Sequence, residues 1–284
     1  MSLTSLLENA DVRQRFKQEF QMPKFSVKQE LVAPPITTRY STVGTAFDYL
    51  LRFVIQKLNP DAIDKGYWVA ENSVELLEQD VSLFDKGKKI VSGARKHFVE
   101  YLETGQMSDE LIESTLLLAT LDPIFRAGVG HEMIGKADKA DIRDLKAILS
   151  VVDERIFTST KLCLVNPTFG AASVLVGGAD ADLVIDDTLI DIKTTKNLVL
   201  DRKMLDQVLG YYVLHCIGSV GGLKPKIPIN KLAIYFSRYG YLHVIQVSEL
   251  VNMSTFPDFV QWFQHRAAEA FPTNAGIGRR RPAP

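Results

Sequence analysis

The spacing of apolar residues in the first half of the chain predicts a series of helices. Across residues 42–58, apolar side chains recur every three or four positions and form one stripe that can be buried. Asn59 and Pro60 follow, and this helix ends there because proline cannot continue it. The same helical spacing is found at residues 73–84, 90–104, 108–121 and 139–152.

From about residue 160 onward, apolar and polar positions begin to alternate with a period of two. This alternation is typical of strands, because successive side chains of a strand point to opposite faces of the sheet. The expected elements are strands at 161–166, 173–185 and 189–195, a helix at 201–217, a hairpin at 231–247 turning at Tyr239–Gly240, and a helix at 256–271. Strands and helices mixed in this order predict an α/β protein with a mixed sheet.

An acidic hairpin at residues 177–194 contains the candidate functional residues of this region. Asp191 and Lys193 share one face of its second strand, whereas the isoleucines next to them point the other way, into a core. A short turn at residues 186–188 pairs the two strands and brings Asp182 near Asp191. Two carboxylates and a lysine are therefore expected at one end of the hairpin.

The residues alone leave two interpretations of this hairpin open. The first is a solvated face with an exposed ion pair between side chains, worth at most about 1 kcal/mol. The second is a site where clustered carboxylates hold a divalent cation, which relieves their mutual repulsion. Asp180 shares the face of Asp182, either as a supporting group of such a site or as a solvated residue.

Four short motifs occur in a fixed order around this hairpin. They are Gly44-Thr-Ala-Phe-Asp48, Gly178-Ala-Asp-Ala-Asp182-Leu-Val, Asp191-Ile-Lys193-Thr194 and Gln207-Val-Leu-Gly-Tyr211. In this set the chain resembles the PD-(D/E)xK nucleases, and within them the RecB-like branch that also holds CRISPR-associated exonucleases. Asp48 stands where the family has histidine, and the four-cysteine cluster of the iron–sulfur members is missing from the sequence.

The resemblance implies a fold and a division of the chain. The expected fold is a restriction-endonuclease-like core, in which helices flank a central mixed sheet, with an α-helical insertion. Residues 41–60 and 155–270 would form this core, and residues 61–154 would form the insertion. Outside them we expect an N-terminal helix and arm at 1–40 and a disordered tail at 271–284.

The resemblance also implies ligands for a metal ion, either Mg²⁺ or Mn²⁺. Asp182 and Asp191 would be the main ligands, and the backbone carbonyl of Ile192 would complete the set. Asp48 could reach the same ion from its helix, because its carboxylate replaces the family's histidine. The alternative for Asp48 is an ordinary ion pair with Arg52, one helical turn further along.

Three further residues take roles from the same resemblance. Lys193 would orient the attacking water and offset negative charge in the transition state. Gln207 would support the lysine and the scissile phosphate, and Tyr211, one helical turn away on the same face, would line the site. The alternative for Tyr211 is plain packing in the core.

Composition limits where the protein works and what it binds. Net charge is −1 over 284 residues, so a nucleic acid would have to be held by local basic patches. The N-terminus has no signal-peptide core and no apolar run reaches membrane-spanning length. The two cysteines imply no disulfide framework, so we expect a cytoplasmic protein without a membrane partner.

These features together predict a metal-dependent deoxyribonuclease. It would act as an exonuclease at DNA ends or on single strands, in DNA repair, phage biology or defence. Two alternatives stay open, namely a non-catalytic nucleic-acid-binding or scaffold subunit on a nuclease-like fold, and a ribonuclease. A protein partner or a second copy of the chain is also compatible with the sequence.

Overall fold

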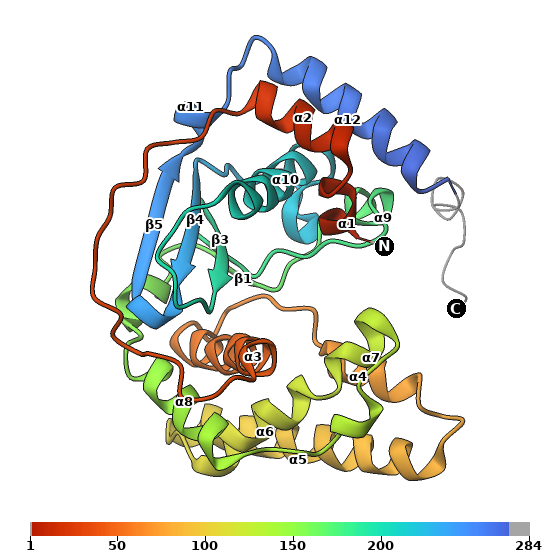
Figure 1. The fold of residues 1–284 in the computed structure, drawn as a ribbon, viewed down its shortest axis with the longest axis vertical. Helices are drawn as coiled ribbons and strands as arrows, with labels where there is room; N and C mark the ends of the chain where they lie inside the picture. Colours follow the sequence, from red (N-terminus) through yellow and green to blue (C-terminus); the bar gives the residue numbers. More distant parts are fainter. Residues whose placement is uncertain (1, 273–284) are drawn as a thin grey trace.

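The computed structural model describes residues 2–272, and its centre is a single mixed sheet (Figure 1). Neighbouring strands pair in the order β1-β2-β3-β4-β5, antiparallel except for the parallel pair of β3 and β4. A parallel pair needs a crossover, and α10 (Arg202–Gly218) provides it. The strands are β1 (Cys163–Val165), β2 (Leu183–Ile185), β3 (Thr188–Lys193), β4 (Lys231–Phe236) and β5 (Tyr241–Gln246).

Helices cover both faces of this sheet. On one face, α10 packs with α1 (Leu3–Leu7), α2 (Ala10–Glu19), α9 (Ala171–Leu175) and α12 (Phe256–Ala270). On the other face lies α3 (Tyr40–Leu58), backed by α6 (Asp109–Ala119) and α8 (Lys139–Leu149). The remaining helices are α4 (Val69–Glu75), α5 (Val81–Thr104), α7 (Asp122–Ala127) and α11 (Val247–Leu250).

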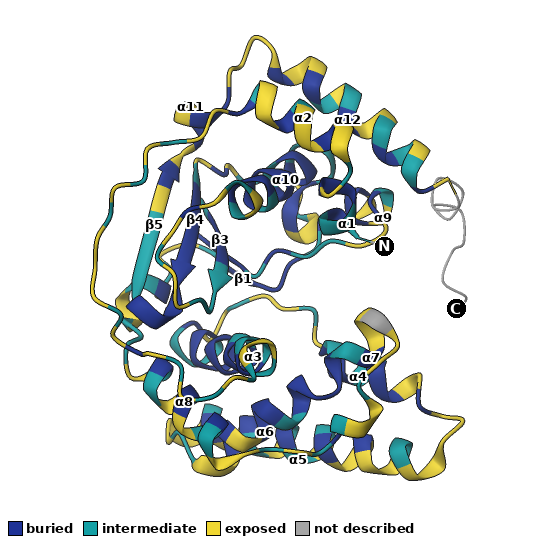
Figure 2. Cartoon of the chain, in the orientation of Figure 1, coloured by how far each residue is buried: buried dark blue, intermediate teal, exposed yellow. Residues whose placement is uncertain are grey.

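The alternation of side chains along the strands divides the interior into two hydrophobic cores. In β3, Leu189 packs in the core around α10, and Ile190 packs in the core around α3. In β4, Ile234 and Tyr235 divide in the same way. Burying a large apolar side chain stabilises the fold by about 1.5–3 kcal/mol, so the sheet is held from both sides. Figure 2 shows the buried residues gathered on both faces.

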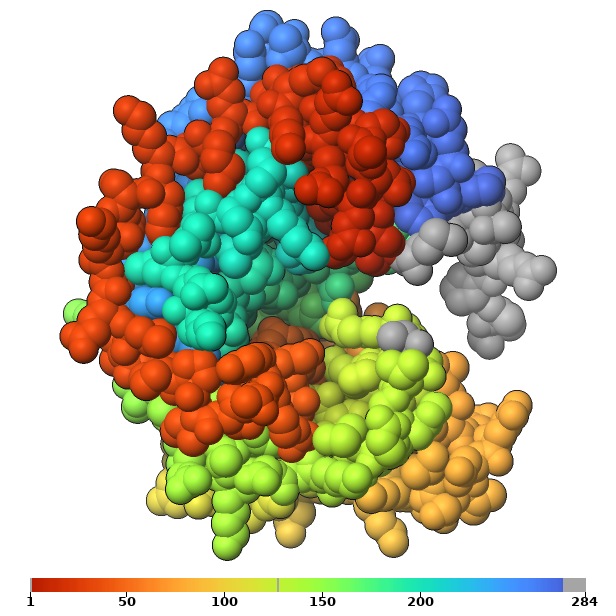
Figure 3. Space-filling model, in the orientation of Figure 1, coloured from red at the N-terminus to blue at the C-terminus, as the bar shows by residue number. Residues whose placement is uncertain are grey.

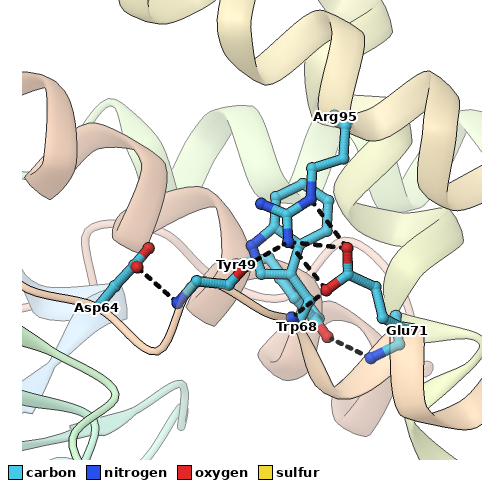
Figure 4. A network of polar contacts seen from close by, with 7 residues as sticks. Tyr49, Asp64, Trp68, Glu71 and Arg95 are labelled. Carbon is cyan, nitrogen blue, oxygen red and sulfur yellow. Dashed lines mark hydrogen bonds and ion pairs between the residues drawn. The ribbon is translucent and has the colours of Figure 1, made fainter. Parts of the chain in front are cut away.

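A third core holds the helices of residues 61–154 against α3. Phe53 of α3 stacks on Phe98 of α5, with 4.3 Å between the ring centroids. Beside them, the guanidinium of Arg95 lies 3.7 Å from the ring centroid of Trp68 and donates hydrogen bonds to both carboxylate oxygens of Glu71 (Figure 4). These contacts fix α4 and α5 relative to the helix that carries Asp48.

The sequence prediction of an α/β protein with a mixed sheet is confirmed, and two local predictions are wrong. The helix expected at residues 73–84 is divided, because α4 ends at Glu75 and the side chain of Asp80 caps a new helix by accepting a hydrogen bond from Leu83 N. The strand expected at 173–185 begins as the helix α9. After it, Gly177 and Gly178 take positive φ angles of 74° and 124°, which reverse the chain before β2.

The two ends of the chain differ in how well they match the prediction. The expected N-terminal helix and arm are present as α1, α2 and an extended segment that passes beside β5 to α3 (Figure 1). Phe271, the first residue of the expected tail, is buried in the core around α10. The rest of the expected tail, residues 273–284, lies outside the described residues.

No helix within residues 2–272 combines the length and the apolar character that crossing a lipid bilayer would require.

Candidate functional site

The hairpin of β2 and β3 places two aspartates side by side. Leu183 pairs with Ile190, so the next position outward on each strand brings Asp182 opposite Asp191, as the sequence predicts. The backbone N–H of Ile192 donates a hydrogen bond of 2.6 Å to Oδ2 of Asp182, which fixes that carboxylate. Asp191 is 1% exposed and Asp182 is half-buried, so the pair is not a fully solvated face.

Lys193 connects this pair to α10. Its Nζ lies 2.7 Å from Oδ2 of Asp191 and donates a hydrogen bond of 3.0 Å to Oε1 of Gln207. The amide Nε2 of Gln207 in turn donates a hydrogen bond of 2.8 Å to the hydroxyl of Tyr211. Because Gln207 and Tyr211 lie one helical turn apart, α10 presents both to the same chain of contacts.

The ring of Tyr211 belongs to the core, which was the packing alternative. It stacks on Phe169 with 5.8 Å between centroids and is buried around α10. Burial raises the pKa of Tyr211 well above its ordinary value, and the charges of Asp191 and Asp182 add to this effect. Tyr211 is therefore a neutral phenol that holds Gln207 and does not line the cavity described below.

Asp48 forms the ion pair with Arg52 that the sequence offered as its alternative role. Arg52 is buried, and its guanidinium lies 5.0 Å from the ring centroid of Tyr49. The pair does not use all of the carboxylate, because Oδ1 of Asp48 is buried without a hydrogen-bond partner. Asp48 is thus paired with Arg52 and also lines the cavity described below, and its role as a metal ligand stays a prediction.

Most of the predicted site residues line one cavity of about 290 Å³ at the end of the hairpin. Strand β3, helix α3, helix α7 and helix α10 each supply part of its wall. The predicted site residues that it brings together are Asp48, Asp182, Asp191, Ile192, Lys193 and Gln207.

Sequence reasoning missed three lining residues of this cavity, Tyr40 and Ser41 at the start of α3 and Arg126 of α7. No local signal distinguishes Arg126, because only the packing of α7 brings it near β3. Tyr40 lies four residues before Gly44, so its helical spacing from the first motif was the one available signal.

The electrostatics of the site are dominated by buried negative charge. Burial raises the pKa of Asp182, and the neighbouring Asp191 raises it further. Burial also raises the pKa of Asp191, against the opposing effect of Lys193. For Lys193 burial lowers the pKa, but the two aspartates together outweigh burial and leave this pKa raised. A single lysine thus faces two carboxylates that are poorly solvated, and a further cation would stabilise them.

The cavity offers a metal ion few ligands, but these ligands are suitable. Within residues 2–272, no group of three or more His, Cys, Asp or Glu side chains is arranged to hold a metal. Both carboxylate oxygens of Asp191 are nevertheless buried without a hydrogen-bond partner, apart from the ion pair with Lys193. Mg²⁺ is commonly held by one or two carboxylates with waters and substrate oxygens completing its shell, so the pair of Asp182 and Asp191 fits such an ion. The carbonyl of Ile192 as a third ligand stays a prediction.

Asp180 takes no part in the cavity. Its Oδ2 lies 3.1 Å from Nζ of Lys65, which comes from the segment after α3. Asp180 was expected either to support the site or to be solvated, and the structure shows it half-buried in an ion pair with Lys65.

Comparisons of the chain with protein-family models, with curated proteins and with solved structures find no significant match. The class of protein must therefore be argued from the site itself.

Proposed function

We propose that the protein is a metal-dependent nuclease that hydrolyses phosphodiester bonds in DNA, at ends or on single strands. The observation that carries this proposal is the connected arrangement of Asp182, Asp191, Lys193 and Gln207 in one cavity, with Asp191 buried. The mixed sheet with helices on both faces supports a restriction-endonuclease-like core of the RecB-like type. Residues 61–154 would then be an insertion into that core.

The acidic pair would hold Mg²⁺ or Mn²⁺ through its free carboxylate oxygens. When bound, such an ion polarises a water molecule and neutralises charge on the phosphate. Hydrolysis adds that water to phosphorus, breaks one P–O bond and places a proton on the leaving oxygen.

The protein's own contribution centres on Lys193. Because the pKa of Lys193 is raised, its ammonium stays protonated and acts as a cation and hydrogen-bond donor. It can therefore orient the attacking water and stabilise the additional negative charge of the transition state. Gln207 holds Nζ of Lys193, and Tyr211 holds the amide of Gln207, so these two residues position the lysine.

A second candidate function is a nucleic-acid-binding subunit without catalysis. It is favoured by one observation, that Lys193 already pairs with Asp191 while no group of three metal-ligating side chains occurs within the described residues. The adjacent carboxylates of Asp182 and Asp191 argue against it, because their mutual repulsion destabilises a fold that makes no use of them.

A nuclease assay with Mg²⁺ and Mn²⁺ tests the proposal. Asp191→Asn and Lys193→Ala should each reduce cleavage of single-stranded DNA by about a hundredfold or more, because each removes a group that acts on the reacting phosphate. Asp187→Asn is the matched control, since Asp187 lies in the turn of the same hairpin and pairs with Lys231 instead.

Two outcomes would reject parts of this proposal. Cleavage that persists in both site variants would mean that another site hydrolyses the substrate. DNA binding by the native protein without cleavage in either metal would favour the non-catalytic function. An RNA oligonucleotide in the same assay decides between a deoxyribonuclease and a ribonuclease.

A further inference from the structure

Two residues on the helical side of the cavity have no role in the site described so far. Arg126 on α7 and Tyr40 at the start of α3 both line the cavity of Asp182 and Asp191. The side chain of Arg126 is 57% exposed, and Tyr40 is 49% exposed. Each therefore presents accessible surface beside the acidic pair.

Arg126 is held only loosely by the fold. Its Nε lies 3.7 Å from Oδ2 of Asp122, which is beyond hydrogen-bonding distance. The other oxygen of Asp122 accepts a hydrogen bond of 2.7 Å from the hydroxyl of Tyr49. Asp122 thus has a strong partner besides Arg126, and the guanidinium of Arg126 keeps donors available for another ligand.

The charge of the cavity favours a role for the Arg126 guanidinium in binding phosphate. Two of the lining carboxylates already have cationic partners, Asp48 in Arg52 and Asp191 in Lys193. The metal ion of the proposed function would meet only the phosphate that reacts, and a neighbouring phosphate beside these acidic groups needs a further positive charge to bind. Arg126 is placed on the cavity wall to receive it, and a guanidinium binds phosphate through two hydrogen bonds at once.

Tyr40 presents an exposed aromatic ring at an anchored helix start. It is the first residue of α3, and the preceding Arg39 donates a hydrogen bond of 2.5 Å to Oδ2 of Asp141 on α8. This bond anchors the start of α3 to the helices of residues 61–154. An exposed ring held in this way can stack on a nucleobase, which requires a base whose face is free.

We propose that the cavity receives a single strand, with Arg126 binding a backbone phosphate and the ring of Tyr40 stacking on an unpaired base. This inference rests on the proposed nuclease function and gives the helical insertion a part in substrate binding. Figure 3 shows the surface hollowed between the lobe that carries α10 and the helices of the insertion, and Figure 1 places α7 beside that hollow. The insertion would thus form one wall of the path of the strand.

A binding experiment separates this inference from catalysis. The probe is a fluorescent thymidine oligonucleotide of about 12 nucleotides, titrated with the protein in Ca²⁺ and followed by anisotropy. A denaturing gel confirms that the probe stays intact. The same probe annealed to its complement serves as the duplex.

Each variant has a matched control on the same protein. Arg126→Gln is compared with Arg143→Gln, which removes an exposed arginine of α8 that does not line the cavity. Tyr40→Ala is compared with Tyr67→Ala, because Tyr67 is equally exposed at 49% and lies outside the cavity. Tyr40→Phe keeps the ring and removes only the hydroxyl.

The expected losses follow from the chemistry of each contact. Arg126→Gln should weaken single-strand binding by about tenfold and reduce the slope of log affinity against log salt by about 0.7. Tyr40→Ala should weaken it by about tenfold, and Tyr40→Phe should restore it, because stacking needs only the ring. Neither change should weaken duplex binding by more than about twofold, and the two controls should bind like the native protein.

Three outcomes would contradict the inference. If the native protein binds the strand and both cavity variants bind it equally well, the inference is overturned and the proposed function stands. Equal losses on single strand and duplex would also overturn it. If the native protein binds neither probe, the inference and the proposed function fail together.

Discussion

At the scale of single residues, the site depends on how Lys193 is held. Its ammonium contacts Asp191 on its own strand and Gln207 on α10, and both contacts are partly buried. A lysine between an acidic strand and a neutral amide keeps its charge and has a defined direction. Under the proposed function, Gln207 and Tyr211 would therefore be positioning residues, which act on the substrate through Lys193.

Replacing Gln207 tests this positioning role. Gln207→Ala should lower kcat by about tenfold with little change in KM, because Lys193 loses the partner that directs it. Tyr211→Phe should lower kcat less, since it removes only the hydroxyl that fixes the amide of Gln207. Steady-state kinetics on a single-stranded oligonucleotide separates the two parameters.

The unfolding of both variants in urea is the control. Tyr211→Phe should stay within about 1 kcal/mol of the native protein, because it loses one neutral hydrogen bond. Gln207→Ala should lose about 1–3 kcal/mol, because it loses that bond and the one from the charged Lys193. A change in KM alone would mean that Gln207 binds substrate without positioning Lys193.

At the scale of elements, a buried ion pair holds the sheet and the insertion together. Arg238, in the connection between β4 and β5, donates hydrogen bonds of 2.7 and 3.0 Å to the two carboxylate oxygens of Asp144 on α8. Arg238 also donates to the carbonyl of Ala33 in the N-terminal arm. Next to it, Ser237 donates a hydrogen bond of 3.0 Å to Oγ1 of Thr194, directly after Lys193. Arg238 and Ser237 thus connect α8 and the N-terminal arm to the end of β3.

Removing one partner of this ion pair should destabilise the protein more than replacing both partners with apolar residues. Asp144→Ala should destabilise the protein by about 3–5 kcal/mol, because it leaves Arg238 charged and buried without its partner. The double variant Asp144→Leu with Arg238→Met should recover a large part of this loss, since no buried charge remains. Denaturant unfolding measures both free energies.

A different ordering would contradict this account. If Asp144→Ala lies within about 1 kcal/mol of the native protein, or if the double variant is the less stable of the two, the ion pair does not hold α8 to the sheet.

At the scale of the whole molecule, the sequence predicted those parts of the site that depend on local periodicity. Asp191 and Lys193 share a face because a strand has a period of two, and a short turn brought Asp182 opposite Asp191. Gln207 and Tyr211 followed from one turn of helix. The order of strands and helices gave the α/β class in the same way.

What the sequence could not predict depends on packing between distant segments. Arg126 reaches the cavity only because the third core fixes the insertion against α3. The contact of Arg238 with Asp144 joins residues 94 positions apart, and no pattern along the chain predicts it. The helix α9 was missed because its apolar residues also suit a strand, and the glycines that end it were interpreted as part of the hairpin.

The central claim is that Asp182 and Asp191 form a binding site for a divalent cation. Calorimetric titration with Mn²⁺ tests this claim most directly. The native protein and Asp187→Asn should bind Mn²⁺ alike, whereas Asp191→Asn should bind it at least about tenfold more weakly. Equal affinity in all three proteins, or no heat of binding in the native protein, would contradict the account.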